Sequence, residues 1–513
     1  MRLYMLFAPA FLDWPVAIAQ RIMEIEPGTK VGGFATGQLH TWEKLQRSNL
    51  PLNPIDRLDD LERVWLATPV DPQEYRHYEE LLGIEALRRL VIADRQIGRG
   101  YVTGGRLPPT PLMRAARNPE LLQRYVVGIL SYFFAKLEDF RPDVVFCYTV
   151  AGSQAYALGL ACQALSIPFA QFKHARIGKR MVIDDSILDE MKPIASCFEA
   201  NLAEPGRKPE LRAEAARYLK DFREMAVAPE YLAHHYKRMR ERRSLIRLLR
   251  QTIGATRATL RGWRQPRDLR RPAPLVQLRY EIQAAVSAER LLRGKLFMRP
   301  GARPKGPFAF MPLHFDPEAS TMVVSAMLTN QLSAAEAVSK SLPLGMTLMV
   351  KEHSPMIGWR PKGYYEQLSS LPGVRLASPI DSGALLARDA ALTTVINGTS
   401  AMEALLFGKP AVVMGHPHFT MVGEGLVHCS NLEELPAAVQ KALASPPVPD
   451  DRLISYLAAA LEGSFECPIE VIWGKVSKQT VDDNSQVLSA IVDRLRALAT
   501  RDPVSRATAH RAV

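Results

Sequence analysis

A short stretch of this sequence, "PLHFDPEAST", places a histidine and two carboxylates directly after an apolar run: His314, Asp316 and Glu318. A histidine or carboxylate at such a position can act as a general base toward a hydroxyl group if it lies within hydrogen-bond reach. An aspartate before Pro317 is also a common turn residue, and an isolated histidine is often structural. We expect Glu318 to be the functional carboxylate, His314 to line the same pocket, and Asp316 to have the structural role.

A second stretch, "VKEHSPMIGWRP", adds Lys351, His353 and Arg360 after another apolar run. Lysine and arginine can stabilise the negative charge of a phosphate leaving group. Two histidines near one lysine favour a charged pocket over two unrelated structural histidines. His416 and His418 indicate a metal only weakly, because no third ligand is evident, so no metal site is predicted.

A third stretch, "INGTSAMEALLFGKP", begins with a small turn that opens a helix. Unpaired backbone N–H groups at a helix N-terminus attract phosphate or carboxylate, which makes Asn397, Gly398, Thr399 and Ser400 candidate phosphate-binding residues. Glu403 follows one turn later on the same face and can accept hydrogen bonds from vicinal hydroxyls such as those of a ribose. A helix N-cap without a ligand is the structural alternative.

A parallel sheet would bring these stretches to one edge. Apolar runs alternate with helical patterns after residue 306, and the expected strands are "PFAFMPLHF", "GMTLMVKEH", "VRLAS", "AALTTVI" and "KPAVVMG". One long helix is expected over "STMVVSAMLTNQLSAAEAVSKSL". Ligands of open parallel sheets bind outside the carboxyl ends of the strands, which is where the candidate residues fall. The same rhythm in "RPDVVFCYTV", "SQAYALGLACQALSI" and "FAQFKH" predicts a second parallel sheet.

The expected fold class is therefore α/β, with two Rossmann-like doubly wound domains that face a cleft and a basic helical insert. A chain of 513 residues fits two or three domains. We predict an N-terminal Rossmann-like domain over 1–200, a basic helical insert or linker over 201–306, a C-terminal Rossmann-like domain over 307–475, and a C-terminal helix and tail over 476–513.

The net charge of +12 comes from one segment. Residues 237–305 contain twenty Lys or Arg against four acids, a local charge of +16. Apolar residues at helical spacing among the arginines would let such a helix lie on an anionic membrane surface. A solvated pair of helices that packs on a neighbouring domain fits the pattern equally well. Nucleic acid is not predicted as a partner, because no nucleic-acid-binding motif accompanies the charge.

Three further features bear on location. No window holds eighteen consecutive apolar residues, so no membrane span is predicted. The apolar N-terminus lacks a convincing cleavage site and fits a strand, loop and helix better than a signal peptide. Five scattered cysteines, an odd number without metal-like spacing, favour a reducing cytoplasm.

The quoted stretches together resemble the capsular polysaccharide biosynthesis proteins, GT-B glycosyltransferases that include the β-Kdo transferases of capsule export. The resemblance is carried by "PLHFDPEAST", "VKEHSPMIGWRP" and "VRLASPIDSGALLARDAALTTVINGTSAMEALLFGKPAVVMG". It is dense over residues 307–435 and thinner over "RPDVVFCYTVAGSQAYALGLACQALSIPFAQFKHARIGKR".

The resemblance implies an enzyme that moves a sugar, for example Kdo from CMP-Kdo, to a lipid-linked or growing capsular polysaccharide. It would make 1–200 the acceptor-side domain and 307–475 the nucleotide-sugar-binding domain. The donor phosphate would lie on the 397–400 turn and the ribose on Glu403. Lys351, His353 and Arg360 would lie near the phosphate or the sugar carboxylate. Arg176 in "KHARIGKR" would meet an anionic acceptor or the donor carboxylate, although a solvated basic turn is an equal alternative.

The implied partners are a nucleotide-sugar donor, the polysaccharide acceptor, the anionic surface of the inner membrane and the capsule export machinery. No cofactor is implied, and the expected location is the cytoplasm, peripheral on the inner membrane. Two alternatives stay open: a sugar-nucleotide 2-epimerase with the same fold, and a non-catalytic capsule assembly or export protein.

Overall fold

The computed structural model describes most of the chain and divides it into two compact units. Unit 1 comprises Met1–Asp94, Arg117–Leu211 and the chain from Ser455 onward, and unit 2 comprises Arg95–Ala116 and Arg212–Ile454. The described residues are those outside 9–10, 37–38, 49, 102–107, 225–251, 255, 257–268, 424, 475 and 501–513. Most of the arginine-rich part of the insert therefore lies outside the described residues, and so does its predicted membrane contact.

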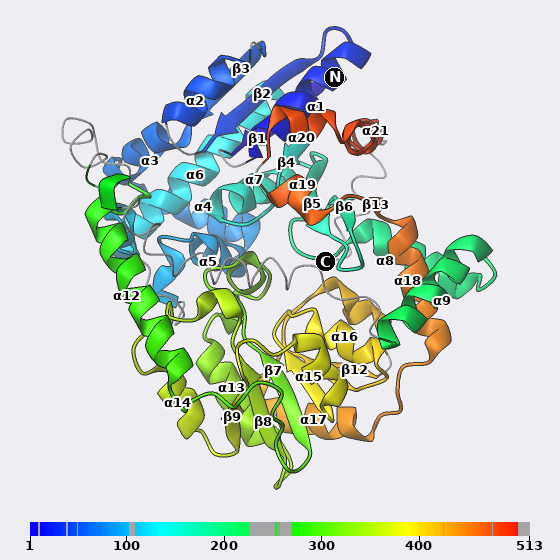
Figure 1. The fold of residues 1–513 in the computed structure, drawn as a ribbon. Helices are drawn as coiled ribbons and strands as arrows, with labels where there is room; N and C mark the ends of the chain where they lie inside the picture. Colours follow the sequence, from blue (N-terminus) through cyan, green and yellow to red (C-terminus); the bar gives the residue numbers. More distant parts are fainter. Residues whose placement is uncertain are drawn as a thin grey trace. The chain divides into compact units, whose positions relative to one another are not determined.

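Unit 1 contains a seven-stranded sheet in the order β13-β6-β5-β4-β1-β2-β3 (Figure 1). Strands β1 to β5 are parallel and follow the order of a doubly wound Rossmann-like sheet. Strands β6 and β13 extend one edge in antiparallel pairing. The bounds are β1 (Arg2–Phe7), β2 (Lys30–Ala35), β3 (Leu52–Arg57), β4 (Val144–Cys147), β5 (Phe169–His174), β6 (Arg180–Asp184) and β13 (Phe465–Glu466).

The helices of unit 1 pack on both faces of this sheet. Alternate residues of a strand point to opposite faces. Leu3 and Met5 of β1 accordingly join one core with α1, whereas Tyr4 contacts Phe140 of α6 with ring centroids 5.8 Å apart. The helices before residue 212 are α1 (Asp13–Ile25), α2 (Leu39–Gln46), α3 (Leu58–Ala67), α4 (Pro72–Leu82), α5 (Ile84–Ala93), α6 (Pro119–Phe140), α7 (Ser153–Ala164), α8 (Lys192–Ala203) and the start of α9 (Pro209–Arg223).

The C-terminal helices complete unit 1. Ile491 and Leu495 belong to the same core as Leu3 and Met5, and Trp14 Nε1 donates a hydrogen bond to the Val471 carbonyl over 2.9 Å. Residues 455–475 were predicted to belong to the other domain, and this boundary is wrong. An apolar stripe on a helix does not reveal which core will bury it. The elements concerned are α18 (Asp450–Glu462), α19 (Ile469–Trp473), α20 (Lys478–Asp482) and α21 (Ser485–Ala499).

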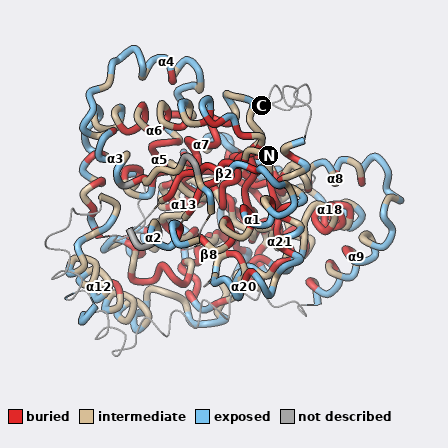
Figure 2. The backbone as a smooth tube through the Cα atoms, turned by 90° about the horizontal axis from the view of Figure 1, so that it is seen from above, coloured by how far each residue is buried: buried red, intermediate tan, exposed pale blue. Residues whose placement is uncertain are grey.

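Unit 2 contains a six-stranded parallel sheet in the order β12-β11-β10-β7-β8-β9. Counted along the chain this is 6-5-4-1-2-3, the Rossmann order, and it reverses between β7 and β10. The strand residues are largely buried, which explains their mostly apolar sequences (Figure 2). The bounds are β7 (Phe308–Pro312), β8 (Thr347–Lys351), β9 (Val374–Leu376), β10 (Leu392–Val395), β11 (Ala411–Val413) and β12 (Leu426–His428).

Helices cover both faces of this second sheet as well. Ala309 and Met311 of β7 pack in one core with residues of α13, α14 and α17. Phe308 and Phe310 pack in the opposite core with residues of α15 and α16. The bounds are α12 (Pro274–Arg293), α13 (Gln331–Ser341), α14 (Tyr364–Ser370), α15 (Gly383–Asp389), α16 (Ser400–Leu406) and α17 (Leu435–Ala444). The predicted α/β class with two Rossmann-like domains is confirmed.

One predicted helix is broken into three pieces. A π-helical turn spans Ser320–Val324, a 3-10 turn spans Ala326–Leu328, and α13 begins only at Gln331. The side chain of Asn330 accepts hydrogen bonds from the backbone N–H groups of Leu332 and Ser333, which starts a new helix there.

None of the helices in the described part of the chain has both the length and the apolarity that a membrane span requires. All five cysteines are free thiols.

Candidate functional site

The candidate residues of unit 2 meet where the strand order of the sheet reverses. In open α/β sheets this switch point, outside the carboxyl ends of the strands, is where ligands bind. His314 follows β7 and Asn397 follows β10, and the backbone N–H of Asn397 donates to His314 Nε2 over 3.2 Å. Because Nε2 accepts this bond, the proton of the neutral imidazole lies on Nδ1. The structure therefore joins two predicted site residues that are 83 positions apart.

The backbone of His314 is fixed by two buried side chains. Gln331 Oε1 accepts from the His314 N–H over 2.6 Å, and Gln331 Nε2 donates to the His314 carbonyl over 3.3 Å. Arg360 Nη2 donates to the same carbonyl over 2.6 Å. Both backbone groups after β7 are thus satisfied, and this sets the direction in which the imidazole points.

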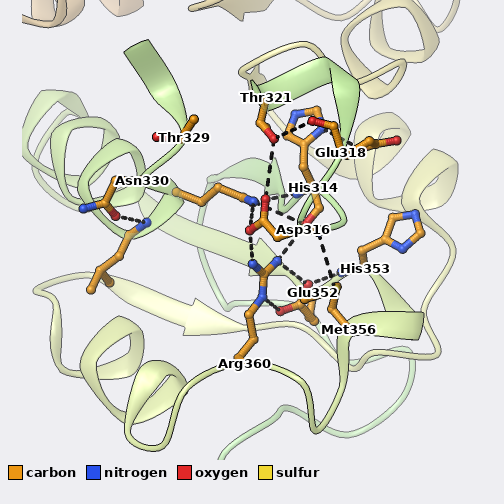
Figure 3. A network of polar contacts seen from close by, with 12 residues as sticks. His314, Asp316, Glu318, Thr321, Thr329, Asn330, Glu352, His353, Met356 and Arg360 are labelled. Atoms are coloured by element: carbon orange, nitrogen blue, oxygen red, sulfur yellow. Dashed lines mark hydrogen bonds and ion pairs between the residues drawn. The ribbon is translucent and has the colours of Figure 1, made fainter. Parts of the chain in front are cut away.

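Arg360 is the centre of a buried ionic network (Figure 3). Its guanidinium pairs with the Asp316 carboxylate and donates to Glu352 Oε2 over 2.7 Å, and the Arg360 side chain has no exposed surface. Gln331 Nε2 also donates to Asp316 Oδ2 over 2.6 Å. The prediction that Arg360 adds a cation to a bound phosphate is therefore corrected, because the buried guanidinium already pairs with Asp316 and Glu352.

Burial and neighbouring charges shift the pKa values of Asp316 and Arg360 in this network. Burial raises the pKa of Asp316 to about 6, even though Arg360 acts in the opposite direction. Burial also acts to lower the pKa of Arg360, but Glu352 and Asp316 outweigh it and raise that pKa. Asp316 thus forms a buried ion pair with Arg360, a contact that its predicted role as a turn residue does not include.

Glu318 and His353 lie in the loops that follow β7 and β8, which also contain Asp316 and Glu352 of the ionic network. The Glu318 side chain is 44% exposed, and its Oε2 lies 3.7 Å from His314 Nδ1. Although the side chain is partly exposed, the surrounding protein removes water from Glu318 and acts to raise its pKa, but His314 and His353 lower it, and the pKa falls to about 2. The His353 ring points away from the ionic network (Figure 3) and lies against Phe315 with centroids 6.0 Å apart. An ionised carboxylate is thus held near two imidazoles.

Lys351 brings a buried ammonium group to this edge of the sheet. It is the last residue of β8, and Nζ donates to the Glu352 carbonyl over 3.1 Å. Burial lowers the pKa of Lys351, whereas the nearby carboxylates of Glu352, Asp381 and Glu403 act to raise it. A desolvated cation near carboxylates gains from an added anionic group such as a phosphate.

The 397–400 turn consists of a buried residue, Asn397, and residues at the start of α16. Asn397 is buried, and its amide donates to the Ser320 carbonyl and to Ser325 Oγ, the latter over 2.6 Å. The side chain of Asn397 therefore joins the turn to the π-helical segment. A Cβ on Gly398 would lie 3.6 Å from Pro312, and one on Gly383 would lie 3.8 Å from Ser400 Oγ, which places the turn beside the ends of β7 and the start of α15. Thr399 is the N-cap residue of α16, and Glu403 lies in its first turn.

Arg176 belongs to unit 1, where it follows β5. Its guanidinium lies 3.3 Å from Asp189, and Lys173 Nζ lies 3.5 Å from the same carboxylate. The Arg176 backbone N–H donates to His174 Nδ1 over 2.9 Å. Arg176 is thus partly neutralised by an acidic neighbour, and its predicted contact with an acceptor or a donor carboxylate stays a prediction.

No metal centre is found in the part of the chain that the structure describes, where no three His, Cys, Asp or Glu side chains gather closely enough to hold an ion. His416 contacts His428 with ring centroids 4.8 Å apart, and His418 is buried.

Comparisons with known proteins give structural matches only. No protein-family model matches the sequence, and no curated protein does either. KpsC of Thermosulfurimonas dismutans, a β-Kdo 2,4 transferase, is 14% identical with a TM-score of 0.33, over 62% of this chain and 78% of that chain. The glycosyltransferase VinC in complex with DTDP is 12% identical with a TM-score of 0.24, over 96% of this chain and 100% of that chain. The UDP-GlcNAc 2-epimerase of Methanocaldococcus jannaschii in complex with UDP-GlcNAc and UDP is 13% identical with a TM-score of 0.26, over 90% and 99%. The chemistry of this chain is accordingly inferred from its own side chains.

Sequence reasoning gave no role to several residues that shape the site. Glu352 lies between Lys351 and His353 in "VKEHSP", and its position directly after a strand could have indicated that it belongs to the site. Tyr365 donates to Glu352 Oε2 over 2.8 Å. Gln331 carries no signal in the sequence, because its partners lie 15 and 17 positions away across a break in a predicted helix.

Substituting Gly415 by alanine is expected to destabilise unit 2 by about 1–3 kcal/mol, because it overpacks the site. A Cβ on Gly415 would lie 2.2 Å from Ser325 Oγ, 2.3 Å from Asn397 Oδ1 and 2.8 Å from the Ile396 carbonyl. Urea unfolding measures the effect. Gly383→Ala is the matched control, since its Cβ meets nothing closer than 3.8 Å. Equal stabilities of the two variants would show that the packing at Gly415 is not tight.

Proposed function

We propose that this chain is a glycosyltransferase that binds a nucleotide-sugar donor at the carboxyl ends of β7, β8 and β10. The observation that best supports this is the hydrogen bond between His314 and Asn397 at the switch point of the sheet, with buried Lys351 at the end of the next strand. The carboxyl ends of parallel strands, where polar groups converge and a pKa is perturbed, are the usual location of a ligand site.

Lys351 is the residue proposed to stabilise the leaving group. Transfer breaks the bond between the anomeric carbon and the donor phosphate, and the bonding electrons stay on the phosphate oxygen. The Lys351 ammonium and the backbone N–H groups of Gly398, Thr399 and Ser400 would stabilise this charge. Glu403 would accept hydrogen bonds from the ribose hydroxyls.

Glu318 is the residue proposed to face the acceptor. The acceptor hydroxyl forms the new bond to the anomeric carbon and loses its proton, which Glu318 can accept within hydrogen-bond reach. Because the pKa of Glu318 is lowered, the carboxylate is a weak base, and orientation of the hydroxyl is its larger contribution. His314 would orient Glu318, and His353 would complete the charged pocket.

The sequence resemblance supports a more specific proposal. The donor would be CMP-Kdo, and the acceptor a lipid-linked or growing capsular polysaccharide. Arg176 would bind an anionic acceptor or the donor carboxylate. The enzyme would act in the cytoplasm, peripherally on the inner membrane and beside the capsule export machinery.

Chelation is expected to leave the transfer rate within about twofold of the untreated rate, because cations of the protein would stabilise the leaving phosphate. The measurement compares the initial rate with 5 mM EDTA, roughly the usual chelating dose, against the rate with added Mg²⁺ or Mn²⁺. A rate that EDTA abolishes and Mg²⁺ restores would contradict the proposed role of Lys351.

The transferase proposal is tested by incubating the protein with CMP-, UDP- and GDP-sugars, with and without a polysaccharide acceptor. Release of nucleotide together with an extended acceptor is expected. Conversion of a nucleotide sugar into its 2-epimer without acceptor would identify an epimerase instead. No turnover with any donor, together with unchanged polysaccharide output in cells that carry Glu318→Gln, would favour a non-catalytic assembly protein.

A further inference from the structure

The exposed residues of helix α12 in unit 2 all lie along one stripe. The exposed positions follow one another at intervals of three or four residues, which keeps them on one face of a helix. At 1.5 Å per residue the stripe is about 27 Å long. Its members are Leu275, Arg279, Ile282, Val286, Arg290 and Arg293.

The opposite face of α12 is fixed to the core of unit 2. Ala284 is buried, and Ala288 and Leu291 pack against the core of the second sheet. Gly358 approaches this face so closely that a Cβ on it would meet the Ala284 carbonyl at 2.1 Å. These contacts fix the rotation of α12 about its axis. Figure 2 shows its turns as exposed and intermediate. The stripe must point outward.

The apolar part of the stripe is unusually accessible. Leu275 is 51% exposed, Ile282 is 41% exposed and Val286 is 46% exposed. Single exposed aliphatic residues are common, but these three share one helical face, where Ile282 and Val286 are neighbours and Leu275 lies two turns from Ile282. Contact with a nonpolar phase would remove this surface from water.

The charged part of the stripe is entirely cationic. Arginines 279, 290 and 293 are exposed on it, and Arg271, Lys295 and Arg299 are exposed beyond the two ends of the helix. The one acid at its margin, Glu289, pairs with Arg293 over 2.7 Å. Arginine can extend its charged end to phosphate while its stem lies on apolar surface.

We propose that this stripe of α12 is a docking surface for an anionic phospholipid membrane, with the aliphatic side chains in the interface and the arginines on lipid phosphates. Only a lipid surface offers an apolar layer directly beside a plane of phosphates. Nucleic acid offers phosphates without the apolar layer. No residue of the stripe belongs to the proposed donor site. The inference adds a surface to the membrane location proposed above, and it does not depend on the transferase activity.

Partition of the full-length protein onto vesicles tests the proposal. The vesicles contain 30% anionic phospholipid, roughly the level at which basic segments bind, or only neutral phospholipid. The wild type is expected to bind the anionic vesicles. Leu275→Ser combined with Ile282→Ser and Val286→Ser is expected to lower the partition coefficient at least tenfold. Neutralising arginines 279, 290 and 293 to glutamine is expected to lower it about fivefold for each charge.

Matched variants control for solubility and net charge. Val64, Leu81 and Ile84 are similarly exposed residues of unit 1, and their triple substitution by serine is expected to leave partition unchanged. Arg21, Arg47 and Arg388 are exposed arginines elsewhere, and their change to glutamine controls for charge.

Four results would overturn the proposal. The first is equal vesicle binding by the α12 variants and their controls, and the second is equal binding of neutral and anionic vesicles. The third is displacement from vesicles by an equimolar DNA duplex. The fourth is a change of oligomeric state or thermal stability in the serine variant without a change in partition, which would show that the chain itself covers the stripe. Nucleotide-induced stabilisation, measured on the same variants, is expected to stay unchanged, so failure of the donor site would be recognised separately.

Discussion

Substituting Lys351 by methionine is expected to lower kcat about 10²–10³-fold, with a smaller effect on KM. Methionine preserves most of the apolar volume of the side chain but removes the ammonium group. The charge on the donor phosphate grows as the glycosidic bond breaks, so the lost interaction is stronger in the transition state than in the ground state. Since burial already lowers the pKa of Lys351, removal of this charge is expected to change the stability of unit 2 little.

The measurement is steady-state transfer with the donor whose nucleotide stabilises the protein most. Lys340→Met is the control, because Lys340 is an exposed residue of the same unit and pairs with Glu336. An equal kcat for the Lys351 and Lys340 variants would remove Lys351 from the chemistry. A fall in both kcat and the melting temperature of the Lys351 variant would indicate a structural role instead.

Substituting Arg360 by methionine is expected to destabilise unit 2 by about 3–5 kcal/mol. The change leaves two buried carboxylates, Asp316 and Glu352, without their shared cation. It also removes a donor to the His314 carbonyl. Urea unfolding measures the loss. A second change, Glu352→Gln, is expected to restore part of the stability, because it removes one of the uncompensated charges.

Arg388→Met is the control for Arg360. Arg388 pairs with Asp389 over 2.9 Å, but its side chain is 45% exposed, so its loss is expected to cost less than about 1 kcal/mol. If the Arg360 variant lost no more stability than the Arg388 variant, the ionic network would not hold the loops after β7 and β8.

Five of the six strands of unit 2 could be predicted, because most of their residues are buried and apolar, as in "FAFMP" and the "LMV" of "TLMVK". Strand β12 was not predicted, because it has only three residues and is partly exposed. The break before α13 was not predicted, although Asn330 within the predicted helix is a good N-cap residue. The packing of α21 on the first sheet could not be predicted, because the apolar stripe of a helix does not show which surface will cover it.

The candidate site was predictable in its position but not in its internal bonding. The rule on the carboxyl ends of parallel strands places His314, Lys351 and the 397–400 turn at one edge of the sheet. Nothing in the local sequence of Arg360 shows that Asp316, 44 positions away, neutralises it. Buried ion pairs depend on tertiary contacts, so a basic residue near a predicted site could equally be a ligand or a support.

The central claim is that the edge of the second sheet binds the nucleotide of a sugar donor, and thermal unfolding with CMP, UDP and GDP tests it most directly. At a hundredfold excess over Kd, the matching nucleotide is expected to stabilise the protein by about 2.7 kcal/mol and raise Tm by about 5 °C. Lys351→Met and Glu403→Gln are expected to reduce this shift, and Lys340→Met to preserve it. No shift with any of the three nucleotides, or an equal shift in the Lys351 and Lys340 variants, would contradict the claim.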